Sequence, residues 1–264
     1  MTGTKIVKLK LENANAPGRL PSLRESTAEK VLSVFMATEY VEPDECYLSF
    51  REQTKDLNVT SSQLQKIIRA LERGHIKNTT DSHKAGMLVS AFIQNSTETE
   101  FHIQSKIPLG CVGYRLQGDK KITIEGDYGD ATGWEMKSGS IHVKGHAGMH
   151  PGIAMEGGTI IVDGNAGLGT GYVMSGGKIH VKGNVGEETG YKMSNGTIEV
   201  DGSSRDQTGF GMHGGTLHIG GNAGKETGND MGGGIIKVDG KISGISGSYK
   251  KGEIWEAEVK VRPK

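Results

Sequence analysis

The sequence is poor in cysteine, and this scarcity excludes several kinds of site. Its two cysteines, Cys46 and Cys111, stand far apart and form no Cys-x-x-Cys pair. A disulfide framework, a cysteine-based zinc site and an iron–sulfur site therefore lack ligands within the chain. No neighbouring residue identifies a base for Cys111, so we interpret it as a small core side chain rather than a nucleophile.

Net charge and long apolar runs are missing as well. The 264 residues include 31 basic and 31 acidic side chains, which gives a formal net charge of zero. Proteins that bind nucleic acid usually carry a basic stripe, so we expect no such partner. No apolar run is long enough to cross a bilayer, and the N-terminus lacks the segments of a signal peptide. We therefore expect a cytoplasmic protein that does not bind membranes.

Glycine, by contrast, is abundant, and its spacing is the main feature of the chain. The 42 glycines would indicate disorder if they were aperiodic. Instead, glycine and methionine recur with a 19-residue period, which indicates a stacked repeat architecture. The first glycine row and the methionine row are Gly126, Gly145, Gly164, Gly183, Gly202, Gly221 and Gly240, and Met136, Met155, Met174, Met193, Met212 and Met231. Two further glycine rows are Gly133, Gly152, Gly171, Gly190, Gly209, Gly228 and Gly247, and Gly139, Gly158, Gly177, Gly196, Gly215 and Gly234.

Each repeat also holds one short strand of alternating apolar residues, such as Ile160 and Val162. A 19-residue unit is too short for a helix pair and suits one turn of a solenoid whose strands stack about 4.8 Å apart. We therefore predict a mainly β protein, a right-handed parallel β-helix of about seven turns. Isoleucine and valine should point inward and methionine should fill the opposite side. Glycine should occupy corners where a Cβ would clash or where φ is positive.

The outward-facing positions support stacking in register. Charges alternate in sign along one column, which would place opposite charges on neighbouring turns. A second column resembles a corner ladder of polar side chains. The two columns are Glu125, Lys144, Asp163, Lys182 and Asp201, and Asp127, Asn165, Asn184, Ser203 and Asn222.

An aromatic column follows the second glycine row and is the candidate interface of the chain. It contains Trp134, Ile153, Tyr172, Tyr191 and Phe210. One interpretation is a ladder of rings partly buried by the N-terminal region. The other is a contact surface for partner subunits, because an exposed apolar stripe of this size is unusual in a monomer.

The first part of the chain, residues 1–83, is predicted to be a small α/β segment. Its helices are indicated by capping patterns and by apolar residues at helical spacing, and its strands by short apolar runs. The expected elements are a strand at residues 5–11, a helix at 27–38, a strand at 47–50, and a helix containing Leu64 and Leu71 that begins at Thr60 or Ser61 and ends near Gly74.

Residues 84–264 are predicted to form the β-helix domain, whose ends depart from the repeat. We expect residues 84–125 to form one or two degenerate first turns, because the terminal repeats of a solenoid must close its core. Within them, residues 87–93 resemble a strand, and one residue is inserted near Tyr114. Residues 255–261 alternate apolar and charged side chains and are predicted to form a closing strand.

Three motifs resemble functional sites but have simpler interpretations. A Gly-x-Gly-x-Gly motif at residues 167–171 lacks the strand–loop–helix context of a phosphate loop, so we interpret it as a repeat corner. Three histidines of one column would lie about 9.6 Å apart, too far for one metal ion, and two others in one turn lack a third ligand. We therefore expect no catalytic, cofactor or metal site in this chain. The histidines are His142, His180 and His218 in the column, and His146 and His150 in the single turn.

At the repeat, the chain resembles a known family. Residues 145–158 read Gly-x-x-Gly-x-x-x-Gly-x-x-Met-x-x-Gly. This pattern is similar to that of the GXGXG β-helix family, which includes the β-helical subunit of formylmethanofuran dehydrogenase and the C-terminal domain of the glutamate synthase large subunit. The resemblance covers about residues 105–247. The unbroken array resembles the dehydrogenase protein, whereas Ile76, Gly86, Ser90 and Ile93 resemble the start of the glutamate synthase domain.

The resemblance implies a structural role. In both relatives the β-helix carries no catalytic group and braces the catalytic parts of a larger enzyme. We therefore expect a subunit of a multisubunit oxidoreductase, first of a formylmethanofuran dehydrogenase, which reduces CO2 to a formyl group in methanogenesis. Molybdenum or tungsten pterin and iron–sulfur clusters would then lie in partner subunits. The alternatives are a free-standing glutamate synthase subunit of ammonia assimilation, beside FMN and iron–sulfur subunits, and a self-contained β-solenoid enzyme.

Overall fold

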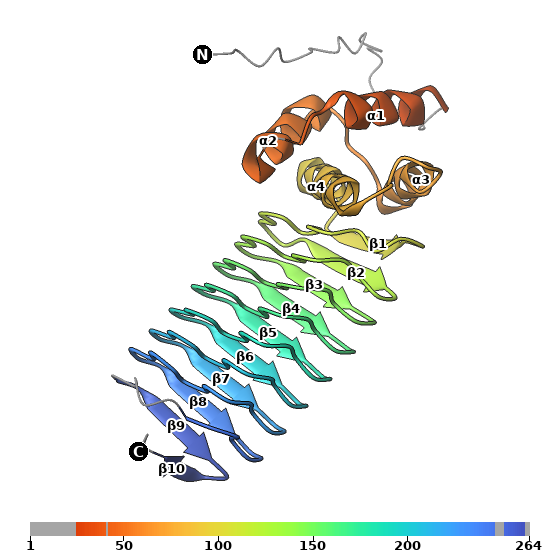
Figure 1. Ribbon diagram of the computed structural model, residues 1–264. Coiled ribbons are helices and arrows are strands. Elements are labelled where there is room, and N and C mark those ends of the chain that lie inside the picture. The colour runs from red at the N-terminus through yellow and green to blue at the C-terminus, as the bar shows by residue number, and fades with distance from the viewer. Residues whose placement is uncertain (1–24, 41, 246–250, 262–264) are drawn as a thin grey trace.

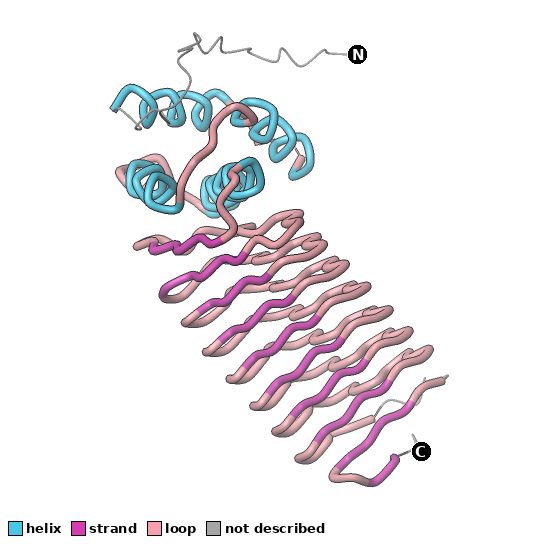
Figure 2. The backbone as a smooth tube through the Cα atoms, turned by 180° about the vertical axis from the view of Figure 1, so that it is seen from behind, coloured by secondary structure: helices cyan, strands magenta, loops and turns pink. Residues whose placement is uncertain are grey.

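The computed structural model describes residues 25–40, 42–245 and 251–261, which form a rod with helices over one end (Figure 1). Seen from behind, the loops of successive turns stack as regularly as the strands (Figure 2). The helices are α1 (Glu25–Ala37), α2 (Pro43–Thr54), α3 (Ser61–Leu71) and α4 (Thr79–Asn95). The strands are β1 (Glu100–Gln104), β2 (Lys121–Glu125), β3 (Ser140–Val143), β4 (Thr159–Val162), β5 (Lys178–Val181), β6 (Thr197–Val200), β7 (Thr216–Ile219), β8 (Ile235–Val238), β9 (Glu253–Glu256) and β10 (Val259–Val261).

Strands β1 to β9 pair in parallel in chain order, which confirms the predicted parallel β-helix. Pairings from β2 to β8 follow the 19-residue period, as Ser140 pairs with Thr159. The solenoid has about eight turns, one more than expected, because β1 and β9 extend the array at both ends. Phe101 pairs with Ile122, two positions beyond the residue one period away, so two residues are inserted in this turn and not one.

The interior is built from the predicted rows. Each central strand alternates buried and half-buried residues, and Ile160 and Val162 of β4 are 0% exposed. The methionine row is buried as well. Outside, the charged column forms a ladder, in which Lys182 Nζ lies 2.7 Å from Asp163 of the preceding turn. Parallel stacking in register explains both features.

The three glycine rows have two different physical reasons. Gly171 (φ 68°) and Gly177 (φ 86°) represent the second and third rows, where φ is positive as expected. A Cβ on Gly171 would also lie 2.4 Å from Ile198 Cδ1. In the first row, Gly126 alone has a positive φ, so that expectation is wrong for its later members. They are glycine because turns approach closely: a Cβ on Gly183 would lie 2.7 Å from the Gly164 carbonyl oxygen.

A row of buried threonines was missed in the sequence. These side chains are 0% exposed, and each hydroxyl donates a hydrogen bond to the carbonyl oxygen three residues earlier, over 2.9 to 3.3 Å. The bond satisfies a polar group that would be costly to bury unpaired. The 19-residue step was the available signal. The row is Thr132, Thr170, Thr189, Thr208 and Thr227.

Replacing Thr189 with valine is expected to lower the free energy of unfolding by about 1 kcal/mol, the usual worth of one buried hydrogen bond. The shape is nearly conserved, and only the 3.1 Å bond to the Gly186 carbonyl oxygen is lost. Urea unfolding measures the effect. Thr216→Val, on the half-buried outer side of β7, is the control and should change stability by less than about 0.5 kcal/mol. Equal effects at both positions would contradict a role for the buried hydroxyl.

The N-terminal part differs from prediction because the regular elements among its described residues are all helices. Helix α1 confirms the helix expected at residues 27–38, and α3 begins at a capping box formed by Thr60 and Gln63. The strand expected at residues 47–50 is wrong, since these residues lie in α2. The strand expected at residues 5–11 lies outside the described residues.

Helix α4 corrects the interpretation of residues 84–95 as part of a degenerate turn. The strand expected at residues 87–93 is wrong, and the predicted boundary between residues 83 and 84 falls inside this helix. Nearly every residue from Ser82 to Ile93 is buried, because the helix lies between the other helices and the first solenoid turn. A helix buried on all sides shows no apolar period, so its sequence does not distinguish it from a buried strand.

Two small residues of α4, Gly86 and Ser90, contact the first turn. A Cβ on Gly86 would lie 1.7 Å from the Gly110 carbonyl oxygen, so the helix and the turn are in direct backbone contact. The Ser90 hydroxyl accepts hydrogen bonds from the backbone N–H groups of Gly113 (2.9 Å) and Tyr114 (3.3 Å). Helix α4 thus covers the first turn around residues 110–114, while α3 packs against β1 (Figure 1).

The far end of the rod closes with a hairpin rather than a single strand. Strand β10 turns back and pairs antiparallel with β9. Ala257 and Glu258, between the two strands, both have positive φ. Among the described residues, no helix has both the length and the apolar character needed to cross a bilayer.

Candidate interaction surface

The predicted aromatic column forms a stacked ladder along the rod. The rings of Tyr172 and Tyr191 are parallel within 7°, with centroids 4.6 Å apart, and Tyr191 stacks on Phe210 at 5.3 Å. All three residues are half-buried. Each stacked pair contributes about 0.5–1.5 kcal/mol beyond the area it buries. The 19-residue step brings the rings into register because each occupies the same place in its turn.

The ladder continues toward the helices through edge-to-face contacts. Trp134 meets Tyr114 at 5.1 Å, and Tyr114 meets Tyr47 of α2 at 5.0 Å. The Tyr114 hydroxyl donates a hydrogen bond to Asp44 of α2. Burial, and then this carboxylate, raise the pKa of Tyr114, so the phenol stays protonated. We call the column from Trp134 to Phe210 the aromatic stripe.

Charge is absent from the middle of the aromatic stripe. Residues 147–155 and 166–174, which form the loops of two consecutive turns, contain no Asp, Glu, Lys or Arg. Met149 is 46% exposed and Val173 is 37% exposed. We call this region, which comprises Met149, Ile153, Ala154, Tyr172 and Val173, the neutral patch.

Charges return on both sides of the neutral patch. In the column next to the aromatic stripe, Glu135 precedes Ala154, and Lys192 and Asp230 follow Val173. Glu135 pairs with Arg115 at 2.7 Å, and Lys192 Nζ lies 5.2 Å from the centre of the Tyr191 ring. Sequence reasoning found the rings but not this change from neutral to charged turns.

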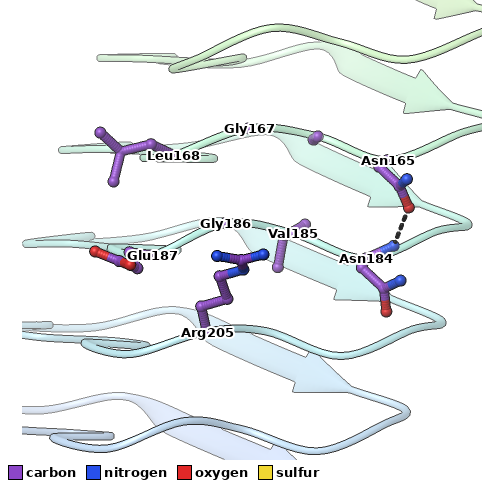
Figure 3. Close-up of a pocket in the computed structure, with 9 residues that line it drawn as sticks. Asn165, Gly167, Leu168, Asn184, Val185, Gly186, Glu187 and Arg205 are labelled. Carbon is purple, nitrogen blue, oxygen red and sulfur yellow. Dashed lines mark hydrogen bonds between the residues drawn. The ribbon is translucent and has the colours of Figure 1, made fainter.

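A shallow hollow of about 500 Å³ is lined by residues of three consecutive turns, at 165–168, 184–187 and Arg205 (Figure 3). Its floor includes Gly167 and Gly186, whose row is interrupted by Arg205. In the close-up, the Asn165 side chain reaches the Asn184 backbone N–H, a bond of 2.8 Å. The side chains here mostly support the stacking of turns, and no nucleophile with a base is among the described residues that line the hollow.

A second hollow of about 480 Å³ lies where α4 begins, and His83 and Tyr128 are among its lining residues. Neither His83 Nε2 nor the Tyr128 hydroxyl has a hydrogen-bond partner within the described part of the chain. Burial lowers the pKa of His83 and raises that of Tyr128, so both are neutral at pH 7. Both polar atoms are buried, although their residues line the hollow.

The histidines occupy structural positions. His142, His180 and His218 each contact the aspartate that follows the strand of the next turn, at 3.0, 2.9 and 3.0 Å. His146 Nδ1 accepts a hydrogen bond from the Asn165 backbone N–H at 2.8 Å, and His150 packs edge-on against Tyr172. Within residues 25–40, 42–245 and 251–261, no three His, Cys, Asp or Glu side chains are placed to hold a metal ion.

Cys111 is a core residue in the structure. It is 0% exposed, and burial raises the pKa of its thiol to about 12, so a thiolate does not form at neutral pH. The corner ladder predicted from Asn165 and Asn184 is present and includes His146. The side chains of the repeat are therefore engaged in packing and in bonds between turns.

The ion pairs of the outer ladder predict an acid-sensitive contribution to stability. Lys182, and then His142, hold the pKa of Asp163 below its usual value. Stability from a lowered pKa is present above the unfolded value, about 3.9, and is lost as pH falls through the folded value. Asp163→Asn should cost about 0.5 kcal/mol at pH 7, and this cost should diminish as pH falls below about 3.9, as measured by urea unfolding. The exposed Asp119, changed to asparagine, is the control; a pH-independent loss for Asp163→Asn would contradict the assignment.

Comparisons with known proteins leave the family open. No model of a known protein family matches the chain, and no curated protein matches it. The resemblance to the GXGXG family therefore remains a hypothesis that rests on the 19-residue repeat.

Proposed function

We propose that the protein is a non-catalytic scaffold subunit of a cytoplasmic multisubunit oxidoreductase. The observation that carries this proposal is the aromatic stripe, an apolar surface on a rod whose other repeat positions serve stacking. The rings of the stripe are half-buried, and Met149 and Val173 beside them are exposed, so contact with another chain would bury further apolar surface. The catalytic and cofactor-binding groups belong, in this proposal, to partner subunits.

The first candidate complex is a formylmethanofuran dehydrogenase. The unbroken array of 19-residue turns supports it, since the resemblance to the β-helical subunit of that enzyme rests on this array. Partner subunits would then hold molybdenum or tungsten pterin and iron–sulfur clusters. The rod would space and brace those subunits without touching the reacting groups.

The second candidate is a free-standing glutamate synthase subunit, and α4 favours it. Three of the residues that resemble the start of the glutamate synthase domain are packed in the structure. Gly86 and Ser90 contact the first turn, and Ile93 is 0% exposed. Gly86, Ser90 and Ile93 all lie in α4, and this shared placement supports the second candidate. Partner subunits would hold FMN and iron–sulfur clusters.

Native purification tests the proposal and separates the two candidates. The tagged protein is purified from its own source at low salt, and co-eluting subunits are identified by mass spectrometry. Bound molybdenum or tungsten is then measured by elemental analysis, and flavin by fluorescence. Metal with pterin supports the dehydrogenase, and a flavin-binding partner supports the synthase. If the protein elutes alone and turns over a substrate, the scaffold proposal is wrong.

A further inference from the structure

We propose that the neutral patch joins two copies of this chain, with the rods antiparallel about a two-fold axis that lies across the stripe. The proposal deepens the scaffold function, because it rests on the stripe being an interface and names the chain that occupies its centre. The result would be a symmetric pair of rods whose outer surfaces remain available to other subunits.

The apolar content of the patch is suited to burial. Met149 and Val173 are two of only five large hydrophobic side chains that are strongly exposed in the described part of the chain. They flank the half-buried Ile153 and Tyr172, and the two loops that carry them contain no charge. A surface without charge can face its own copy without bringing like charges together.

The repeat gives this surface a self-complementary order. The axis passes between the turns of Ile153 and Tyr172. Each turn on one side of the axis therefore faces the turn at the same distance on the other side of the axis in the second copy. Ile153 then faces Tyr172 of the second copy, and Trp134 faces Tyr191. Four turns take part, a length of about 19 Å at the inter-strand spacing. An isologous contact of this kind forms a closed dimer and does not extend into a fibre.

The neighbouring column sets the register by charge. The same axis places Ala154 opposite Val173 and Glu135 opposite Lys192, so that two ion pairs flank the apolar centre. Sliding the second copy by one turn, which moves the axis half a turn toward the C-terminus, would place Glu135 opposite Gly211 and Ala154 opposite Lys192, so both ion pairs would be lost. Complementary charges at an interface rim favour one register over another in this way.

One like-charge contact, made twice because of the two-fold axis, remains in the preferred register. Asp130 faces Glu187 of the second copy, four residues before the stripe in each turn. Glu187 is exposed at the corner of the solenoid, where water and salt screen the repulsion. This contact lies outside the apolar centre and does not alter the order of the stripe.

A charge-pair exchange tests the proposal. Val173→Lys and Ala154→Glu each place a charge against an apolar residue of the second copy, whereas the double variant places the two new charges opposite each other. The column tolerates both residue types, because Glu135 and Lys192 already occupy it with the same positive φ as Ala154 and Val173. The variants are therefore expected to keep the native fold, which circular dichroism and thermal unfolding check.

The oligomeric state is measured by sedimentation equilibrium on the purified full-length chain. The wild-type protein is expected to be a dimer, each single variant should weaken dimerisation at least about tenfold, and the double variant should recover it. Thr216→Lys is the matched control, since Lys178 holds the equivalent place in β5, and it should remain dimeric. A monomeric wild type, or single variants as dimeric as the control, would overturn the inference. Those results would leave the scaffold proposal standing, because that proposal is decided by the co-eluting subunits.

Discussion

Replacing Gly86 with alanine is expected to detach α4 from the solenoid and to cost about 4 kcal/mol or more, the range of the most damaging single substitutions. The added Cβ would lie 1.7 Å from the Gly110 carbonyl oxygen and 2.8 Å from its carbonyl carbon. Neither atom belongs to a flexible side chain, so the helix must move as a body. Ser90 would then lose its bonds to Gly113 and Tyr114, and the apolar end of the first turn would open to water.

For Gly86→Ala, helix propensity and backbone contact predict changes in stability of opposite sign. Within a helix, alanine is favoured over glycine by about 1 kcal/mol, so local propensity predicts stabilisation and contact predicts the opposite. Hydrogen exchange should show lost protection at residues 110–114, with β5 to β7 unchanged, because each solenoid turn contacts mainly its neighbours. Thr80→Ala, at an exposed position of the same helix, is the control and should change stability by less than about 0.7 kcal/mol. A Gly86→Ala variant more stable than wild type would refute the contact.

Replacing Gly177 with alanine should destabilise the centre of the rod by about 4 kcal/mol, through strain and clash together. The residue has a φ of 86°, which alone costs an alanine about 1–2 kcal/mol. Its Cβ would also lie 2.7 Å from Met155 Cε and 2.8 Å from the Gly158 carbonyl oxygen. The methionine can bend away, but the backbone of the preceding turn cannot, so the two turns must separate.

A second glycine isolates the strain from the clash. Gly118 has a φ of 79°, and a Cβ there would meet nothing within 4 Å. Gly118→Ala should therefore cost only about 1–2 kcal/mol, and the difference between the two variants is the energy of the contact between turns. Urea unfolding measures both losses, and hydrogen exchange should locate them at β4 to β6 for Gly177→Ala and at β1 to β3 for Gly118→Ala. Similar losses for the two variants would show that backbone conformation, and not close stacking, explains the third glycine row.

The repeat made most of the fold predictable. Each turn must place isoleucine, methionine and glycine at the same points of its circuit, and stacking in register copies this requirement to the next turn. The sequence therefore displays the tertiary structure directly as a 19-residue period. The paired Lys182 and Asp163, and the stacked Tyr172 and Tyr191, were predicted in this way and lie next to each other in the rod.

The helical end was predictable only in part. Helix α3 has one apolar face and a capping box, and both can be recognised in its local sequence. Residues 47–50 and 87–93 are short apolar runs whose period is hidden, the second because α4 is buried on every side. At residues 87–93 local propensity could not separate strand from helix, since burial on all sides favours apolar residues in either form.

The sequence by itself determined the period, the inward-facing rows and therefore the parallel β-helix, because the same contacts recur in every turn. Only the tertiary structure decided how the rod ends and which surface it offers. The contact of Gly86 with Gly110 joins a helix to a solenoid turn, and no repeat in the sequence indicates it. The neutral patch likewise depends on which loop residues emerge beside the stripe. A contact that recurs in every turn imposes a period on the sequence, whereas a contact made once imposes no period.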